Sequence, residues 1–272
     1  MMIDINSILI WQTFNCYNFE EITHSYYYKG KRVNLSVTQY IERFFEPFDK
    51  YGISEKYAKK HGLSQEEVLK DWERKGKIAS ISGTMIHSYL ENAKRGKTFE
   101  PDYSDAIKEG LYDEVRERYE ILIPQAKAFH QDTLGKLFPI HLEYTVGIRN
   151  IIAGNIDMLC WNEKAQEFQI WDYKNLKEYT TRNIYGKHAK ESFKYLEDTT
   201  QTHYSIQLNM YKAILQRILG IPIGKCYIVH FSYTQPENGF NIYECLDLQD
   251  ECNIELDKLE VEYANKSDDT GL

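Results

Sequence analysis

The chain has 272 residues, 42% of them hydrophobic, and a formal net charge of −8 at pH 7. This length is enough for one large domain, or for one domain with a smaller appendage, and because no stretch approaches about 18 uninterrupted apolar residues, a membrane span is not expected. The five cysteines are scattered and form no Cys-x-x-Cys pair, which argues against a zinc knuckle or an iron–sulfur cluster.

The first twenty residues carry no recognisable targeting signal. Asp4 precedes the apolar run at residues 8–11, and there is no basic cluster before that run. The segment therefore resembles neither a secretory signal nor an Arg-rich transit peptide. We expect a cytoplasmic protein that does not associate with a membrane.

Residues 1–78 are expected to form an N-terminal hairpin and a helical appendage. Alternation around Lys29-Gly30 predicts a hairpin over residues 26–35. Ser36 follows as a candidate N-cap for a helix, and two further helices are expected at residues 54–60 and 64–77. The remainder, residues 79–272, is expected to form the second and larger unit.

This second unit begins with helices. Ser82 or Thr84 is expected to cap a helix that ends near Gly96. His87 and Glu91 are four residues apart in that helix, so their side chains share one face.

A long amphipathic helix is expected next, at about residues 104–134, and Pro124 should kink or break it. A strand at residues 141–148 then opens a meander. Two more strands, at residues 153–161 and 167–174, should pair as an antiparallel hairpin across a polar turn.

The turn of this hairpin sets the register of the two strands. If it is centred between Lys164 and Ala165, Asp157 lies directly across from Asp172, with Cβ atoms about 4.5–5.5 Å apart. Lys174 is two residues beyond Asp172, so both side chains lie on the same sheet face.

Two carboxylates placed opposite each other destabilise a sheet unless a cation lies between them. Mg²⁺ removes the repulsion, because it takes oxygen ligands from one or two carboxylates and completes its shell with water and substrate phosphate. Lys174 would then be able to orient water or to stabilise developing charge. Taken alone, an Asp-x-Lys sequence more often consists of ordinary charges at the end of a strand.

The C-terminal part supplies the remaining elements of an α/β fold. A helix at residues 202–219 is apolar nearly all round and should be buried, with Gln207 and Tyr211 one turn apart on it. Strands are expected at residues 225–233 and 241–246, followed by an acidic helix at about residues 249–263. The fold class is therefore α/β, with a mixed central β-sheet flanked by helices. The whole net charge of −8 belongs to the acidic C-terminal segment, since residues 1–243 hold 31 basic and 31 acidic residues.

Motifs from several of these elements together resemble those of the PD-(D/E)XK nuclease superfamily, in the branch that holds RecB-like nuclease domains, lambda-type phage exonucleases and the mitochondrial genome maintenance exonuclease. The resemblance covers about residues 72–217, and its motifs in chain order are Gly83-Thr84-Met85-Ile86-His87 with Glu91, then Glu143, Gly154-Asn155-Ile156-Asp157, Asp172-Tyr173-Lys174 and Gln207-Leu208-Asn209-Met210-Tyr211. Any one of these motifs is common by chance, whereas five in the family's order are a specific signal.

The resemblance implies a restriction-endonuclease-like core and a metal-dependent DNA nuclease. It implies that His87, Asp157, Asp172 and the carbonyl group of Tyr173 bind the metal ion, with Mg²⁺ as the cofactor and Mn²⁺ as a substitute. It also implies that Lys174 positions or activates the attacking water.

Further residues receive roles from the same resemblance. Gln207 and Tyr211 would line the catalytic cleft, and Glu91 and Glu143 would be auxiliary groups. The expected activity is that of an exonuclease on free DNA ends in phage or bacterial recombination, repair or genome processing. DNA is the expected partner, and a single-strand annealing or replication protein is a further candidate.

Two other functions remain open at this point. The same core also serves structure-specific and sequence-specific endonucleases, and a descendant of it can be a catalytically silent nucleic-acid-binding module. The sequence lacks the four flanking cysteines of the cluster-bearing members and also lacks a Gly-x-x-x-x-Gly-Lys-Ser/Thr loop, so a stand-alone nuclease without a helicase motor is implied.

Overall fold

A computed structural model gives the fold and describes residues 16–20, 23, 25–235 and 239–269. The expected absence of a targeting signal concerns a segment that lies mostly outside these residues. Across the described ranges, no helix combines the length and the apolar character needed to cross a membrane.

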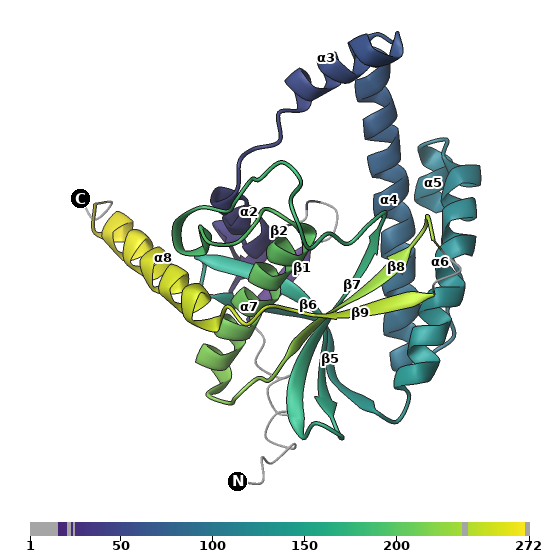
Figure 1. The fold of residues 1–272 in the computed structure, drawn as a ribbon. Helices are drawn as coiled ribbons and strands as arrows, with labels where there is room; N and C mark the ends of the chain where they lie inside the picture. Colours follow the sequence, from purple (N-terminus) through teal and green to yellow (C-terminus); the bar gives the residue numbers. More distant parts are fainter. Residues whose placement is uncertain (1–15, 21–22, 24, 236–238, 270–272) are drawn as a thin grey trace.

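A mixed six-stranded sheet forms the centre of the molecule (Figure 1). Its strands are β4 (Leu35–Ser36), β5 (Leu137–Ile148), β6 (Ile152–Asn162), β7 (Glu167–Leu176), β8 (Cys226–Ser232) and β9 (Phe240–Glu244). Strand β6 runs antiparallel to β5 and β7, β8 runs antiparallel to β9, and the β7–β8 and β4–β6 pairs are parallel. The expected α/β class with a mixed sheet is confirmed.

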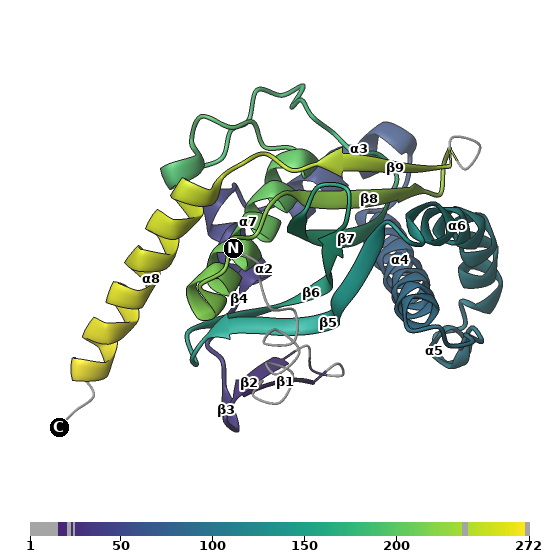
Figure 2. The same cartoon turned by 90° about the horizontal axis from the view of Figure 1, so that it is seen from below.

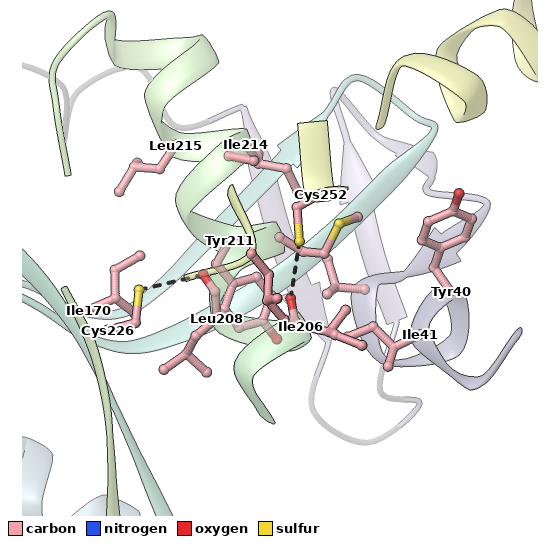
Figure 3. Packing of buried hydrophobic residues seen from close by; sticks show 14 of the residues in the cluster. Tyr40, Ile41, Ile170, Ile206, Leu208, Tyr211, Ile214, Leu215, Cys226 and Cys252 are labelled. Atoms are coloured by element: carbon pink, nitrogen blue, oxygen red, sulfur yellow. Dashed lines mark hydrogen bonds between the residues drawn. The ribbon is translucent and has the colours of Figure 1, made fainter. Parts of the chain in front are cut away.

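Helices cover both faces of this sheet (Figure 2). On one face lie α4 (Gln65–Lys94) and α6 (Tyr112–Thr133), with the short α5 (Ser104–Lys108) beside them; the other face carries α2 (Val37–Ile41), α7 (Thr200–Leu219) and α8 (Gln249–Asp269). Each face has its own buried apolar cluster. Figure 3 shows part of the second cluster, in which Ile206 and Leu208 of α7 also accept weak hydrogen bonds from the thiols of Cys252 and Cys226.

The N-terminal hairpin is part of a small separate sheet, made of β1 (Tyr17–Glu20), β2 (Ser25–Tyr28) and β3 (Lys31–Arg32). The predicted turn at Lys29-Gly30 joins β2 to β3, and both residues have the positive φ that a tight hairpin turn requires. Ser36 caps α2 as expected, through a capping box with Gln39. A 3₁₀ turn, η2 (Glu42–Phe44), and α3 (Lys50–His61) follow, and another 3₁₀ turn, η3 (Glu191–Phe193), precedes α7.

The expectation of two separate helices before residue 96 is wrong, because α4 runs without a break from Gln65 to Lys94. Ser82 does not cap a helix. Its hydroxyl group donates a 2.7 Å hydrogen bond to the Ile78 carbonyl oxygen inside the same helix, a bond that lets serine sit in a helix interior. The expected boundary between residues 78 and 79 falls within α4.

The expected break at Pro124 is also wrong. Helix α6 continues past this proline, and the interruption lies earlier, at Gly110, whose φ of 67° ends α5. Proline removes one helical hydrogen bond, but Leu122, Ala126 and Phe129 on the same helix are fully buried. Packing of this face is what holds the helix together across Pro124.

Candidate metal centre

Asp157 lies where the regular pairing of β6 with β7 ends. The observed register, with Met158 opposite Trp171, is the predicted one, and one further step brings Asp157 opposite Asp172. At that step the backbone N–H of Tyr173 donates a 2.8 Å hydrogen bond to Asp157 Oδ2. The edge of β6 that pairs with β7 also pairs with β4, but only through the first two residues of β6. Between β4 and β7 this edge of β6 is therefore unpaired, and Asp157 lies at the end of the unpaired stretch, next to β7.

Glu143 approaches Asp157 from β5, the strand on the other edge of β6. Regular pairing of β5 with β6 is present on both sides of Glu143 but does not include it, and its φ is 50°. This left-handed conformation is unfavourable for any residue with a Cβ. Strain of this kind gathers at functional sites, and here it directs a carboxylate toward Asp157. The amide of Asn155 holds that carboxylate with a 2.5 Å hydrogen bond.

His87 faces this pair of carboxylates from α4. Its Nε2 lies 2.9 Å from the carbonyl oxygen of Tyr173, and since a carbonyl oxygen can only accept, Nε2 must carry the proton. Nδ1 lies 3.4 Å from Asp157 Oδ2. When the His87 ring is neutral, Nδ1 and Asp157 Oδ2 are both hydrogen-bond acceptors, and their lone pairs repel each other. Either a second proton on the ring or a cation between the two atoms removes this repulsion. Metal-binding histidines commonly donate their other N–H group to a backbone carbonyl in this way.

Asp172 and Lys174 form an ion pair beside the cluster, on the shared sheet face that the alternation predicts. Asp172 is 3% exposed, and its Oδ2 makes no hydrogen bond of good geometry within the described residues. The Lys174 ammonium also lies over the Tyr204 ring, 5.2 Å from its centre. Burial acts to lower the Lys174 pKa, but the charges of Asp172 and Asp157 outweigh it and raise that pKa. Lys174 is therefore a protonated cation.

Gln207 and Tyr211 reach the site from α7. Gln207 Nε2 donates a 2.9 Å hydrogen bond to the hydroxyl oxygen of Tyr211, and the Tyr211 ring packs directly on the backbone of Gly154. A Cβ at Gly154 would lie 2.4 Å from Tyr211 Cε1, closer than real Cβ contacts. Glycine is required here because the ring occupies the place of a side chain.

We expect Gly154→Ala to lower the free energy of unfolding by about 1–3 kcal/mol, because overpacking forces neighbouring groups to move. Urea denaturation followed by circular dichroism measures this change. Gly76→Ala is the matched control, since no atom lies within 4 Å of a Cβ placed there and alanine should stabilise a helix interior by up to about 1 kcal/mol. Equal effects of the two substitutions would contradict the assigned packing.

All these side chains open into one cleft of about 760 Å³. The sequence-predicted residues on its wall are His87, Glu91, Glu143, Asp157, Asp172, Lys174, Gln207 and Tyr211. Tyr173 contributes its backbone groups, while its ring is buried against Phe129 and Phe231. Glu91 is held by a 2.8 Å ion pair with Arg95.

The cleft also has a wall that sequence reasoning did not assign. Phe19 and Tyr26 of the N-terminal sheet and Thr38 of α2 line it. Alternation showed that residues near Tyr26 form a hairpin, but no local signal indicates which distant surface that hairpin covers. Asn155 was part of a recognised motif, and the structure adds its contacts with Glu143 and Thr145.

Three groups in the cleft are placed to share one cation. His87, Glu143 and Asp157 each offer a ligand atom, and these atoms all lie within 4.8 Å of one another. Burial, then the charges of Asp157 and Glu91, raise the Glu143 pKa to about 9. Burial and Asp157 raise the Asp172 pKa to about 6.

This donor set suits a small divalent ion. Carboxylate oxygens are preferred by Mg²⁺ and Mn²⁺, and imidazole nitrogen is acceptable to Mn²⁺. Glu143, expected as an auxiliary group, thus lies with His87 and Asp157. Asp172 contacts Lys174, and the Tyr173 carbonyl group accepts a hydrogen bond from His87 Nε2–H.

Metal affinity is expected to increase as pH rises from 5 to 8. Glu143 and Asp172 bind protons below their raised pKa values, and an ion that needs these carboxylates ionised must displace those protons. Titration calorimetry with Mn²⁺ in two buffers of different ionisation enthalpy should show net proton release at pH 7. Affinity independent of pH, with no proton release, would contradict the expected ionisation of the cluster.

Comparison with known proteins leaves the site to be interpreted from its own geometry. No family model and no curated protein matches the chain. A solved structure described as "Crystal structure of SSO0001" is similar over 67% of this chain and 86% of its own, with 13% sequence identity and a TM-score of 0.30. A likeness of this size carries no argument about fold or function.

Proposed function

We propose that this chain is a metal-dependent DNA nuclease of the PD-(D/E)XK superfamily that hydrolyses phosphodiester bonds from free DNA ends. The observation that carries the proposal is the cluster of His87, Glu143 and Asp157, whose ligand atoms lie within 4.8 Å of one another. The ion pair of Asp172 with Lys174 lines the same cleft.

In this proposal His87, Glu143 and Asp157 hold Mg²⁺, or Mn²⁺ in its place, and Asp172 offers a further oxygen. A divalent cation bound there polarises a phosphoryl group and lowers the pKa of water. The Tyr173 carbonyl group fixes the His87 ring by accepting a hydrogen bond from its Nε2–H group, so the Nδ1 lone pair remains available. The Asn155 amide keeps Glu143 directed into the cluster.

Lys174 then acts as a fixed positive charge. Its pKa is raised by the neighbouring carboxylates, so at neutral pH it cannot accept a proton from water in the metal-free protein. An ammonium group can instead donate hydrogen bonds to the attacking water or to a phosphate oxygen, and such preorganised donors stabilise the charge that develops in the transition state. Gln207 and Tyr211, joined by a hydrogen bond, provide further polar groups for the substrate.

A panel of end-labelled substrates tests this function. Purified protein with Mg²⁺ or Mn²⁺ is incubated with linear single-stranded DNA, linear double-stranded DNA, covalently closed circular DNA and RNA of the same sequence. The proposal expects linear DNA to be degraded from its ends, and circular DNA and RNA to persist. Cleavage of circular DNA would indicate an endonuclease instead, and binding without cleavage in any metal would indicate a silent module.

A further inference from the structure

An arm formed by α3 and the first half of α4 stands clear of the rest of the molecule (Figure 1). Large side chains lie exposed on it, with Phe48 67%, Tyr51 69% and Tyr57 44% accessible. The buried residues of α3 are Ser54 and Ala58, so small residues face α4 and the aromatic rings of α3 are left outside.

Several of these rings gather around Trp72 of α4. The ring centres of Phe48 and Tyr57 lie 5.9 and 6.5 Å from that of Trp72, and Tyr57 also stacks on His61 at 4.1 Å. The planes of the Phe48 and Tyr57 rings are inclined at 48° and 62° to that of Trp72, so the three rings form an uneven aromatic surface with exposed ring area. Further rings, such as nucleic-acid bases, can stack on a surface of this kind.

Helix α3 also carries lysines beside the aromatic residues. Lys60 lies three residues after Tyr57 and four after Lys56, so it shares a flank of α3 with both, and Lys50, seven residues before Tyr57, lies at the start of that flank. Among the described residues none of these lysines has an ion-pair partner, whereas Lys59 on the other flank pairs with Glu55 at 2.6 Å. We call Phe48, Lys50, Lys56, Tyr57, Lys60 and Trp72 the arm patch.

Flat rings interleaved with unpaired cations match the chemistry of single-stranded nucleic acid, which offers bases for stacking and phosphates for charge. A stacked duplex hides its bases from such rings. A membrane surface calls for a continuous apolar helix face, but on α3 lysines interrupt the exposed rings. The shared chemistry of single-stranded DNA and RNA is therefore the best match.

Helix α4 joins the arm patch to the metal cluster. Trp72, Ala79, Gly83 and His87 recur at spacings of seven and four and so lie on one face of α4, about 22 Å from the first to the last by helical rise. The side chains on this face between Trp72 and His87 are small, so they project little from the helix backbone. At Gly76 no atom lies within 4 Å of where a Cβ would be. The last turns of this face, from Ala79 to His87, line the cleft.

We propose that the arm patch binds single-stranded nucleic acid and aligns it along α4, so that its end enters the cleft at His87. The alignment toward the cleft rests on the proposed nuclease function, whereas the binding itself does not. The two ideas can therefore fail separately.

Fluorescence anisotropy in EDTA, where hydrolysis is prevented, measures the binding. The probes are labelled 30-mers of deoxythymidine and of uridine and a 30-base-pair DNA duplex. Tyr57→Ala should weaken binding of the single strands about fivefold to a hundredfold, the range for loss of one stacked base. Lys56→Ala combined with Lys60→Ala should reduce the slope of log affinity against log salt by about 1.4, at about 0.7 for each single-strand phosphate.

Matched variants separate stacking from folding. Tyr57→Phe keeps the flat ring and should bind as wild type, while Tyr57→Leu keeps apolar bulk without the ring and should bind as weakly as alanine. Tyr112→Ala, and Lys97→Ala combined with Lys164→Ala, change exposed residues elsewhere and should leave affinity unchanged. A preference for deoxythymidine or uridine identifies the natural strand.

Single-strand affinity that is the same in wild type and in the Tyr57 and lysine variants would overturn the proposal. So would loss of duplex binding alone, or patch-dependent binding to anionic vesicles in place of nucleic acid. If the arm patch binds single strands but no metal supports hydrolysis, the nuclease function fails and the binding surface stands.

Discussion

Asp157→Asn is expected to abolish detectable binding of Mn²⁺ and Mg²⁺ and, with it, hydrolysis of DNA. Asp157 lies between Glu143 and Asp172 and offers a ligand atom beside His87 Nδ1. Loss of a group that merely supports a metal ligand costs about 10- to 100-fold in metal affinity, so loss of the ligand itself should cost at least about a hundredfold. Titration calorimetry measures the affinity directly.

The asparagine variant should fold, because its side-chain oxygen can still accept the Tyr173 N–H hydrogen bond that Asp157 accepts. It should also be at least as stable as wild type without metal, since the asparagine carries no charge to repel the Asp172 carboxylate. Saturating Mn²⁺ should then raise the melting temperature of wild type but not of the variant. Asp132→Asn, which removes an exposed carboxylate paired with Lys136, is the control. Wild-type metal affinity in Asp157→Asn would exclude Asp157 as a ligand.

Lys174→Met is expected to lower the rate of hydrolysis about 100- to 1000-fold, the usual effect of removing one preorganised donor from a transition state. Metal binding should survive, because methionine removes a positive charge and leaves the cluster intact. The variant thereby separates a catalytic loss from a loss of metal. Rates at saturating Mn²⁺, together with Mn²⁺ affinity, test both parts.

The same substitution should have a pH-dependent effect on stability. It leaves the buried Asp172 carboxylate without its cation, which costs about 3–5 kcal/mol when the group must stay ionised. The Asp172 pKa is already raised to about 6 and should rise further, so at pH 5 the group takes a proton and the cost falls. Urea unfolding should show a much larger loss at pH 8 than at pH 5.

Two further variants serve as controls for Lys174. Lys258→Met removes a cation from Glu255, another buried carboxylate, and should affect stability but not hydrolysis. Asp172→Asn combined with Lys174→Met should recover stability without activity. Near-normal hydrolysis by Lys174→Met, or loss of metal binding in that variant, would contradict the assigned role.

The hairpin that carries Asp157 and Asp172 could be predicted from sequence because its information is local. Alternation fixes which face each side chain takes, and a polar turn centred between Lys164 and Ala165 gives the register. The structure has that register, with Met158 opposite Trp171. The place of Asp172 and Lys174 on one face follows from the same period.

The place of Glu143 in the cluster could not be predicted from local sequence. In sequence it is one acidic residue in a strand, and its position depends on a left-handed backbone within β5 and on Asn155 across the sheet. Neither follows from propensity or spacing. The grouping with His87 also requires α4 to pack against the sheet, which is a contact between residues more than fifty positions apart.

The errors in the helices have a common cause. Ser82 and Pro124 are local signals for the start or the end of a helix, and in both cases burial of the helix outweighs the local preference. Exposure of the arm patch likewise depends on α3 standing away from the sheet, which no local pattern in residues 50–61 indicates. Tertiary packing decided these features.

The rate of hydrolysis of end-labelled linear DNA, compared between wild type and Asp157→Asn in Mg²⁺, Mn²⁺ and EDTA, tests the central claim most directly. Wild type should degrade the DNA in Mg²⁺ and Mn²⁺ and leave it intact in EDTA, and the variant should leave it intact in all three. Degradation at equal rates by the two proteins, or by wild type in EDTA, would contradict a nuclease centre built on His87, Glu143 and Asp157.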